Sequence, residues 1–237
     1  MNKEQFERTM GLIGEDIANS LQTKTIAVIG LGGVGGTALE ALVRTGFNKF
    51  VLVDGDVVNS SNLNRQILYT QANIGQSKVC AAERRILAIN PDSSIQVANL
   101  KINSETITKL DEYKIDFIID AIDDVPAKVL LAKYANDKNI PIIVSLGMAN
   151  RFDPSQVQII RLDKTTDDPL AKKFRHEVKS FGIDTKSIMA VCSKETPVKD
   201  GTNLNSIMTV PSAAGLNIAL YVLKHFMKGG KEHEEHL

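Results

Sequence analysis

Residues Ile26 to Gly36 read Ile-Ala-Val-Ile-Gly-Leu-Gly-Gly-Val-Gly-Gly, and this stretch decides the fold. Its apolar first half predicts a buried strand, and its glycines predict a tight turn into a helix. Gly30, Gly32 and Gly35 fit the pattern GxGxxG, with Gly33 inside the same turn, so the backbone can approach a phosphate. The helix N-terminus adds N–H donors and a partial positive charge. The stretch predicts nucleotide binding, and a turn whose glycines serve packing alone stays open as the alternative.

A carboxylate follows at the end of the next predicted strand, Phe50–Asp54. Asp54 lies 19 residues after Gly35, a spacing at which an acidic side chain can bind ribose hydroxyls. Asp56 lies two residues further on. This combination supports nucleotide binding but does not separate NAD from ATP.

A polar loop and a lysine beyond this carboxylate are what an ordinary dinucleotide-binding domain lacks. The loop should lie over the carboxyl end of the strand, where ligands bind in open α/β sheets. Lys78 is expected near the start of a helix, where the helix dipole disfavours a cation unless it faces an anion. These groups predict a site for ATP whose phosphates are attacked, and a solvated surface lysine is the alternative. The loop residues are Ser61, Asn62, Asn64, Arg65 and Gln66.

Two adjacent acids, Asp123 and Asp124, follow the predicted strand Asp116–Asp120 at the same edge of the sheet. Magnesium suits one or two carboxylates together with phosphate oxygens, so Asp123 is a candidate ligand for magnesium bound to ATP. Both acids also precede a predicted helix, Pro126–Lys138, and capping of that helix is the alternative.

Strands and helices alternate along the chain, which predicts an α/β fold with a Rossmann-like doubly wound, mostly parallel sheet. We expect one domain over residues 1–237, with an N-terminal helix (1–20), a nucleotide-binding core (24–150), a C-terminal extension (151–227) and a flexible tail (228–237). Short strands in the extension should continue the sheet in antiparallel fashion. Further expected strands are Ser94–Leu100, Pro141–Ser145, Val157–Leu162, Ser187–Val191 and Ile207–Val210; further helices are Val34–Arg44, Ser77–Ile89, Ser104–Leu110, Asp168–Ser180 and Pro211–Phe226.

Composition limits the classes of function. The 237 residues are 43% hydrophobic, enough for one core, and 28 basic residues balance 28 acidic ones, so RNA binding would need a local patch. Cys80 and Cys192 have no CxxC spacing and predict two reduced thiols in the cytoplasm. No signal peptide is expected at the N-terminus, and the apolar stretch Ile207–Phe226 predicts a buried or interface helix, without stable membrane insertion.

These motifs together resemble the ubiquitin-activating-type adenylyltransferases, which include activators of the thiamine and molybdopterin sulfur carriers. The resemblance implies that Asp54 binds ribose and that Asn62, Arg65 and Lys78 contact the phosphates of ATP. It also implies that Asp123 holds magnesium or the nucleotide, and that Arg8 completes the ATP site of the partner in a homodimer. The matching stretches are Gly30–Gly35, Asp54–Asp56, Ser61–Gln66, Gly75–Lys78 and Asp120–Asp123.

The second half is similar to one branch of that family, the tRNA threonylcarbamoyladenosine dehydratases, in Asp168–Arg175, Cys192–Glu195 and Val210–Leu216. Sulfur-carrier activators usually have paired CxxC zinc ligands and a catalytic cysteine in a crossover loop, and this sequence lacks the pairs. The resemblance implies an enzyme that uses ATP and Mg2+ to cyclise the threonylcarbamoyl group on an adenosine beside the tRNA anticodon. A sulfur-transfer protein stays open as a further partner.

Three other functions remain to be separated from this one. An adenylating enzyme for a sulfur-carrier or ubiquitin-like C-terminus would exchange pyrophosphate with a carrier protein that ends in Gly-Gly. An NAD-dependent oxidoreductase would leave Arg65 and Lys78 without a role. A nucleotide-sensing module would bind ATP without turnover on any tRNA.

A local basic patch is expected on the helix Asp168–Ser180, which places several cations together. We expect this face to bind tRNA phosphates, and a solvated basic face is the alternative. Three histidines near the C-terminus, His225, His233 and His236, have irregular spacing that does not favour a metal site. The cations of the patch are Lys172, Lys173, Arg175, His176 and Lys179.

Overall fold

A single seven-stranded sheet organises the chain in the computed structural model, which describes residues 2–166, 168–198 and 204–228. The strand order is β3-β2-β1-β4-β5-β7-β6. The order reverses between β1 and β4, which is where doubly wound folds bind their ligands. The strands are β1 (Thr25–Ile29), β2 (Lys49–Val53), β3 (Ser94–Ala98), β4 (Phe117–Asp120), β5 (Ile142–Ser145), β6 (Val157–Arg161) and β7 (Met189–Ser193).

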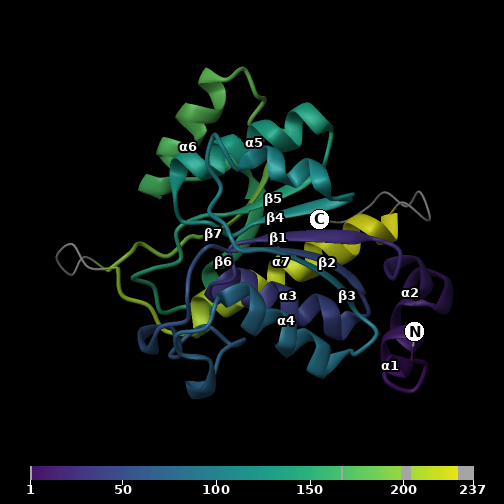
Figure 1. The fold of residues 1–237 in the computed structure, drawn as a ribbon. Coiled ribbons are helices and arrows are strands. Elements are labelled where there is room, and N and C mark those ends of the chain that lie inside the picture. The colour runs from purple at the N-terminus through teal and green to yellow at the C-terminus, as the bar shows by residue number, and fades with distance from the viewer. Residues whose placement is uncertain (1, 167, 199–203, 229–237) are drawn as a thin grey trace.

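Helices cover both faces of the sheet. Figure 1 shows α5 and α6 on one side of the strands and α3, α4 and α7 on the other, with α1 and α2 at one end. No helix in the described part of the chain is both long and apolar enough to cross a membrane. The helices are α1 (Glu7–Ile13), α2 (Glu15–Leu21), α3 (Gly33–Thr45), α4 (Lys78–Ile89), α5 (Val125–Lys138), α6 (Pro169–Ser180) and α7 (Thr209–Lys228).

The pairing is parallel everywhere except between β6 and β7. The expected mostly parallel, doubly wound sheet is therefore confirmed. The expectation that all the short C-terminal strands are antiparallel was wrong for β7, which pairs parallel with β5. The reason is topological, because α6 returns the chain to the edge of the sheet where β5 begins.

The central strand β1 shows why the sheet is covered twice. Ile26 and Val28 pack in the core cluster under α3 and α7, whereas Ala27 and Ile29 pack in the cluster that includes α5. All four side chains are at most 1% exposed. A continuous apolar run is what a parallel strand buried on both faces requires.

Three predicted elements differ from the structure. The N-terminal helix is broken at Gly14, whose φ of +88° interrupts the helix between α1 and α2. Ile207–Val210 does not form a strand, because α7 already begins at Thr209. The predicted helix Ser104–Leu110 is a short 3-10 helix, Ile107–Glu112. The predicted flexible tail, apart from residue 228, lies outside the described residues, as do residues 199–203 of the predicted C-terminal extension.

Candidate active site

The glycine-rich turn joins β1 to α3 and serves both packing and ligand access. A Cβ at Gly35 would lie 1.9 Å from the Gly30 carbonyl oxygen, so this position admits no side chain. At Gly32 the nearest atom to a Cβ would be Gln66 Nε2 at 3.9 Å, so packing does not demand a glycine there. Packing explains Gly35, and the open space at Gly32 agrees with a backbone that a phosphate approaches.

Asp54 is held in place by the turn it faces. Its carboxylate accepts a hydrogen bond from the Leu31 N–H at 2.8 Å and one from the Asp56 N–H at 2.9 Å. The Tyr69 hydroxyl donates to the Leu31 carbonyl at 2.9 Å, and burial raises the pKa of that phenol. The carboxylate predicted to bind ribose is therefore fixed relative to the turn predicted to bind phosphate.

Lys78 is the first residue of α4 and faces carboxylates at the end of β2. Its Nζ lies 3.1 Å from Asp56 Oδ2 and 3.9 Å from Asp54 Oδ2, with the lysine side chain only 8% exposed. Lys101 Nζ lies 2.9 Å from the other oxygen of Asp56. The hydrogen bond from Lys101, and then that from Lys78, holds the pKa of Asp56 below its ordinary value.

Lys101 is a site residue that the sequence analysis missed. It follows β3 by three residues, at the same edge of the sheet as Asp54 and Asp56. Lys101 could have been found from its position shortly after β3, because β3 lies next to β2 in the sheet. That position becomes informative only when the strand order is known.

Arg65 belongs to the polar loop, and its carbonyl oxygen would lie 3.2 Å from a Cβ at Gly33 in the glycine-rich turn. Its Nη1 donates to the Ser61 carbonyl at 2.8 Å and to Asn64 Oδ1 at 2.9 Å, which are bonds within its own loop. Asn62 Oδ1 accepts from the Asn59 N–H at 3.0 Å and closes the turn. Gln66 is 5% exposed, and its Oε1 is a buried oxygen without a hydrogen-bond partner in the structure. A buried orphan acceptor of this kind points to a donor from a ligand or a water molecule.

The acids at the end of β4 and directly after it have three different roles. Asp124 caps α5, because its carboxylate accepts from the Ala127 N–H at 2.9 Å, so the capping alternative applies to this residue. Asp123 is exposed at the carboxyl edge, and its charge contributes to raising the pKa of Lys101 after the larger effect of Asp56. Asp120 is fully buried, 2.9 Å from Lys128 Nζ.

Arg8 does not join these residues within one chain. It is exposed on α1, and the preceding helical turn is anchored near the end of α4 by a 2.9 Å bond from Gln5 Nε2 to the Ile89 carbonyl. Ile89 leads into β3 at the amino edge of the sheet, opposite the glycine-rich turn. A role for Arg8 at an ATP site therefore requires a second chain.

A second group of charged residues, beyond β5 and β7, bonds mainly to backbone. Arg151 is 4% exposed and donates from Nε to the Glu195 carbonyl at 3.0 Å, and from Nη1 to the Gly147 carbonyl. Asp168 accepts from the Gly147 N–H at 3.0 Å and caps α6. Sequence reasoning identified Asp168 and Glu195 only as motif residues and missed Arg151. Their shared task is to hold the loops at this edge of the sheet.

The predicted basic patch is mostly exposed. Lys172, Lys173, His176 and Lys179 face solvent from α6. Arg175 differs, because its guanidinium donates to the Thr165 carbonyl and hydroxyl and so supports the loop before α6.

The cysteines and histidines of the described residues form no metal cluster. Cys80 lies on α4 and Cys192 in β7, and burial raises the pKa of the Cys192 thiol. His225 packs edge-on against Phe117, with ring centroids 5.1 Å apart. Within the described ranges no three His, Cys, Asp or Glu side chains are placed to hold a metal ion. His233 and His236 lie outside those ranges.

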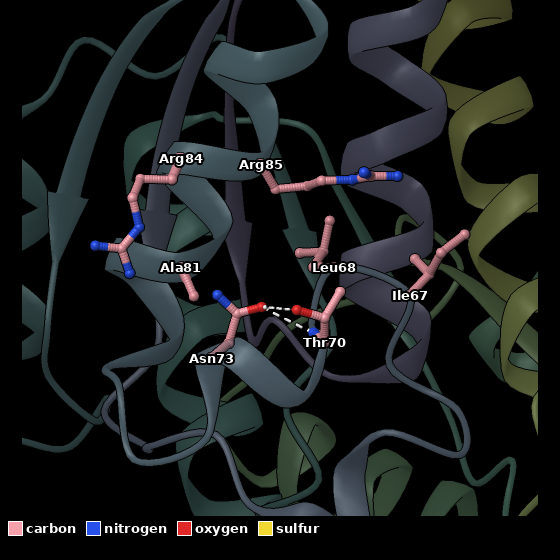
Figure 2. A pocket seen from close by; sticks show the side chains of 7 residues that line it. All are labelled: Ile67, Leu68, Thr70, Asn73, Ala81, Arg84 and Arg85. Carbon is pink, nitrogen blue, oxygen red and sulfur yellow. Dashed lines mark hydrogen bonds between the residues drawn. The ribbon is translucent and has the colours of Figure 1, made fainter.

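A cavity of about 310 Å³ lies between α4 and residues 67–73. Figure 2 shows Arg84 and Arg85 on its α4 side, with Thr70 and Asn73 hydrogen-bonded to each other across from them. Arg85 is already paired with Glu40 at 3.0 Å, and Arg84 donates to Gln76. The cavity shares none of its lining residues with the predicted nucleotide site. Its lining is Ile67, Leu68, Thr70, Asn73, Ala81, Arg84 and Arg85.

Comparison with known proteins identifies relatives over nearly the whole chain. The model of the ThiF family matches residues 6–236. A tRNA threonylcarbamoyladenosine dehydratase of Bacillus subtilis is 38% identical over 194 residues, which cover 82% of this chain and 76% of that protein. The Escherichia coli enzyme of the same name is 35% identical over 209 residues, covering 84% and 78%.

The solved structures agree with this result. The crystal structure of the E. coli dehydratase in complex with ATP has a TM-score of 0.92 to this chain at 32% identity, covering 96% of each chain. The same enzyme has also been solved with AMP, at a TM-score of 0.91. These matches confirm the resemblance found in the sequence and the α/β fold predicted from it.

Proposed function

The chain belongs to the ThiF family, and from this premise we propose that it is an ATP-dependent tRNA threonylcarbamoyladenosine dehydratase. The observation that supports the proposal most directly is the pair of Asp54 and Lys78 beside a glycine-rich turn, in a chain similar to an ATP-bound dehydratase. The substrate is tRNA that carries threonylcarbamoyladenosine, and the reaction consumes ATP.

The chemistry removes one water from the modified nucleoside in two steps. The threonyl carboxylate attacks the α-phosphorus of ATP and pyrophosphate leaves. The carboxyl carbon then carries AMP, a good leaving group, in place of hydroxide, a poor one. A nitrogen of the same threonylcarbamoyl group then attacks the activated carbonyl carbon, and AMP and a proton leave as the ring closes. No enzyme nucleophile is needed for either step.

The site residues act on charge and position. Asp54 would bind the ribose, and Ser61, Asn62, Asn64 and Gln66 would line the phosphate path. Arg65 and Lys78 would neutralise charge on the α-phosphate and on the departing pyrophosphate, and preorganised stabilisation of this kind often contributes more to catalysis than any other effect. Binding of ATP would draw Lys78 away from Asp56, whose other oxygen keeps its bond to Lys101.

Asp123 fits a magnesium ion that arrives with ATP. Its exposed carboxylate lies at the carboxyl edge without a hydrogen-bond or ion-pair partner among the described residues, and magnesium needs only one or two protein carboxylates when phosphate oxygens supply the rest. When bound, the ion would supply positive charge on the phosphate oxygens. Asp124 is the next residue in the sequence and Asp56 follows β2 at the same edge of the sheet, but each already has partners of its own.

We also propose a homodimer in the cytoplasm. Leu216 and Leu220 are 56% and 48% exposed, one turn apart on α7, and such an apolar face suits an interface with a second copy. In the dimer Arg8 would reach the ATP site of the partner. A sulfur-transfer protein remains a candidate additional partner.

The test is to incubate the protein with ATP, magnesium and tRNA that carries threonylcarbamoyladenosine, and then to weigh the released nucleosides. We expect loss of one water that depends on ATP and falls about 100- to 1,000-fold in Arg65→Ala. NAD should not compete with ATP. Binding of ATP without a mass change would contradict the proposal, and pyrophosphate exchange with a carrier ending in Gly-Gly would instead identify a carrier activator.

The basic face of α6 is the proposed contact for tRNA phosphates. Lys172→Glu combined with Lys173→Glu should weaken tRNA binding and reduce the slope of log Kd against log salt, because fewer counterions are released. Arg175 is left intact, since its substitution would disturb the loop at Thr165. Unchanged affinity and slope would remove α6 from the RNA surface.

A further inference from the structure

Exposed aromatic side chains are rare in this protein. Of its eight phenylalanines and four tyrosines, all within the described ranges, only Phe152 and Phe181 are largely exposed, at 61% and 53%. An aromatic ring left in water costs free energy unless a partner covers it. Phe181 follows the end of α6, where the chain leads toward the start of β7 at the amino edge of the sheet. Phe152 lies after β5, at the carboxyl edge.

The backbone that presents Phe152 is fastened on both sides. Its N–H donates to both carboxylate oxygens of Glu195, each at 3.0 Å, and its carbonyl accepts from the Thr209 hydroxyl at 3.5 Å. The neighbouring Arg151 is buried and bonded to the Glu195 carbonyl at 3.0 Å. These hydrogen bonds fix the loop backbone and leave the Phe152 ring in solvent. Such rigidity lowers the entropy cost of binding a partner with this ring.

Phe152 also lies in a continuous hydrogen-bonded surface that reaches the nucleotide loop. The Asn150 N–H donates to the Asn205 carbonyl at 2.7 Å. One residue further, the Ser206 carbonyl accepts from Asn64 Nδ2 at 2.8 Å, and Asn64 is bonded to Arg65. The ring and the predicted phosphate contact are thus on one edge, joined through a segment of two residues.

The surroundings of Phe152 suit an acidic, planar partner. Across Gly147 lies the start of α6, with the exposed Lys172 and Lys173, neither of which has an ion pair within 4 Å among the described residues. The nearby acids are already occupied: Asp153 bonds to Ser155, and Glu195 to the backbone.

We propose that Phe152 stacks on an unpaired base of the tRNA anticodon loop and thereby holds the target nucleotide at the ATP site. The proposal rests on the dehydratase function proposed above. Sequence-specific RNA recognition targets single-stranded loops whose bases stack on aromatic side chains, and the lysines of α6 would take the flanking phosphates. A second copy of the chain is the competing occupant of the same surface.

The test uses an anticodon stem-loop RNA with 2-aminopurine in the loop, whose fluorescence falls on stacking. Phe152→Ala should weaken RNA binding about 5- to 150-fold, the loss typical for one stacked base. The slope of log Kd against log salt should stay unchanged, because no phosphate contact is removed. Phe152→Tyr should retain binding and quenching, whereas Phe152→Leu should lose the quenching.

The matched control is Phe181→Ala, which removes the other exposed ring and should leave RNA affinity unchanged. The affinity for ATP should be the same in all variants, and KM for tRNA should rise in Phe152→Ala while KM for ATP does not. Equal RNA affinities of Phe152→Ala and wild type would overturn the inference, as would a change of Phe152→Ala from dimer to monomer. A wild-type protein that binds the RNA with quenching but shows no ATP-dependent mass loss would refute the proposed function and leave the stacking intact.

Discussion

Two lysine–aspartate pairs lie at the carboxyl edge of the same sheet, and their surroundings differ. Lys128 pairs with Asp120 at 2.9 Å, and both side chains are 0% exposed. Lys78 pairs with Asp56 at 3.1 Å, and the side chain of Asp56 is 46% exposed. The first pair is sealed between α5 and the sheet, whereas the second opens toward the predicted nucleotide site.

The difference separates support from function. Lys128 also donates to the Ile122 carbonyl at 3.1 Å, so its ammonium group is used within the protein. In the proposed function Lys78 would exchange a carboxylate for a phosphate, since Asp56 keeps Lys101 and Asp54 keeps two N–H donors. Burial of a charge pair therefore does not by itself mark an active site; an exchangeable partner does.

Lys128→Met should give the largest loss of stability. It leaves Asp120 buried without its cation, which typically costs about 3–5 kcal/mol. Burial raises the pKa of Asp120, and loss of Lys128 raises it further. The folded state then binds a proton that the unfolded state releases, so the deficit should be largest near pH 8 and shrink as the pH falls toward about 4.

Urea unfolding at several pH values measures this effect. The double variant Lys128→Met/Asp120→Asn should regain much of the lost stability, because no buried charge remains. Lys133→Met, on the exposed side of the same helix, is the control and should barely change unfolding. A Lys128→Met protein as stable as wild type would show that Asp120 needs no partner.

Lys78→Met should reduce turnover strongly and stability only slightly, the opposite of Lys128→Met. Turnover with ATP should fall about 100-fold, because a charge that stabilises the transition state is lost. The unfolding free energy should drop by only about 1–2 kcal/mol, since both aspartates retain other partners. Steady-state kinetics and thermal melting separate the two effects, and unaltered turnover would assign Lys78 to support as well.

Lys101→Ala should have the smallest effect and sharpens the role of Asp56. The pKa of Asp56 should move up toward its ordinary value but stay below it, because Lys78 remains. The stability from this lowered pKa is present above the unfolded value of about 3.9 and is lost as the pH falls through the folded value. Carbon-13 NMR titration of the Asp56 carboxyl measures the shift, and an unmoved pKa would contradict the Lys101 bond.

The sequence predicted the first half of the fold well because its strands are uninterrupted apolar runs. Gly30, Gly35 and the β1 run placed the turn within one residue of the observed start of α3. Failures came where local pattern and tertiary contact disagree. The stretch Ile207–Val210 was predicted as a strand from its local apolar pattern. The observed helix α7 begins at Thr209 instead, and one face of it packs on α3 and the sheet.

The residues of the candidate site also differ in whether a local sequence pattern could reveal them. Residues adjacent in sequence, such as Arg65 and its loop, could be found from motifs. Lys101 and Arg151 could not, because Lys101 meets Asp56 only through the β2–β3 pairing, and Arg151 acts through backbone atoms of Gly147 and Glu195. Capping by Asp124 was an open alternative that needed the observed 2.9 Å bond to be settled.

The strand order β5-β7-β6 has a consequence for synthesis of the chain. β6 leaves the ribosome before β7, yet its partner in the sheet is β7, which inserts between β5 and β6. Until residues 189–193 emerge, β6 has no strand to pair with, and the edge of β5 stays open. Unpaired strand edges invite association with other chains. The interval between the emergence of β6 and that of β7 is therefore a time when this protein needs protection from aggregation.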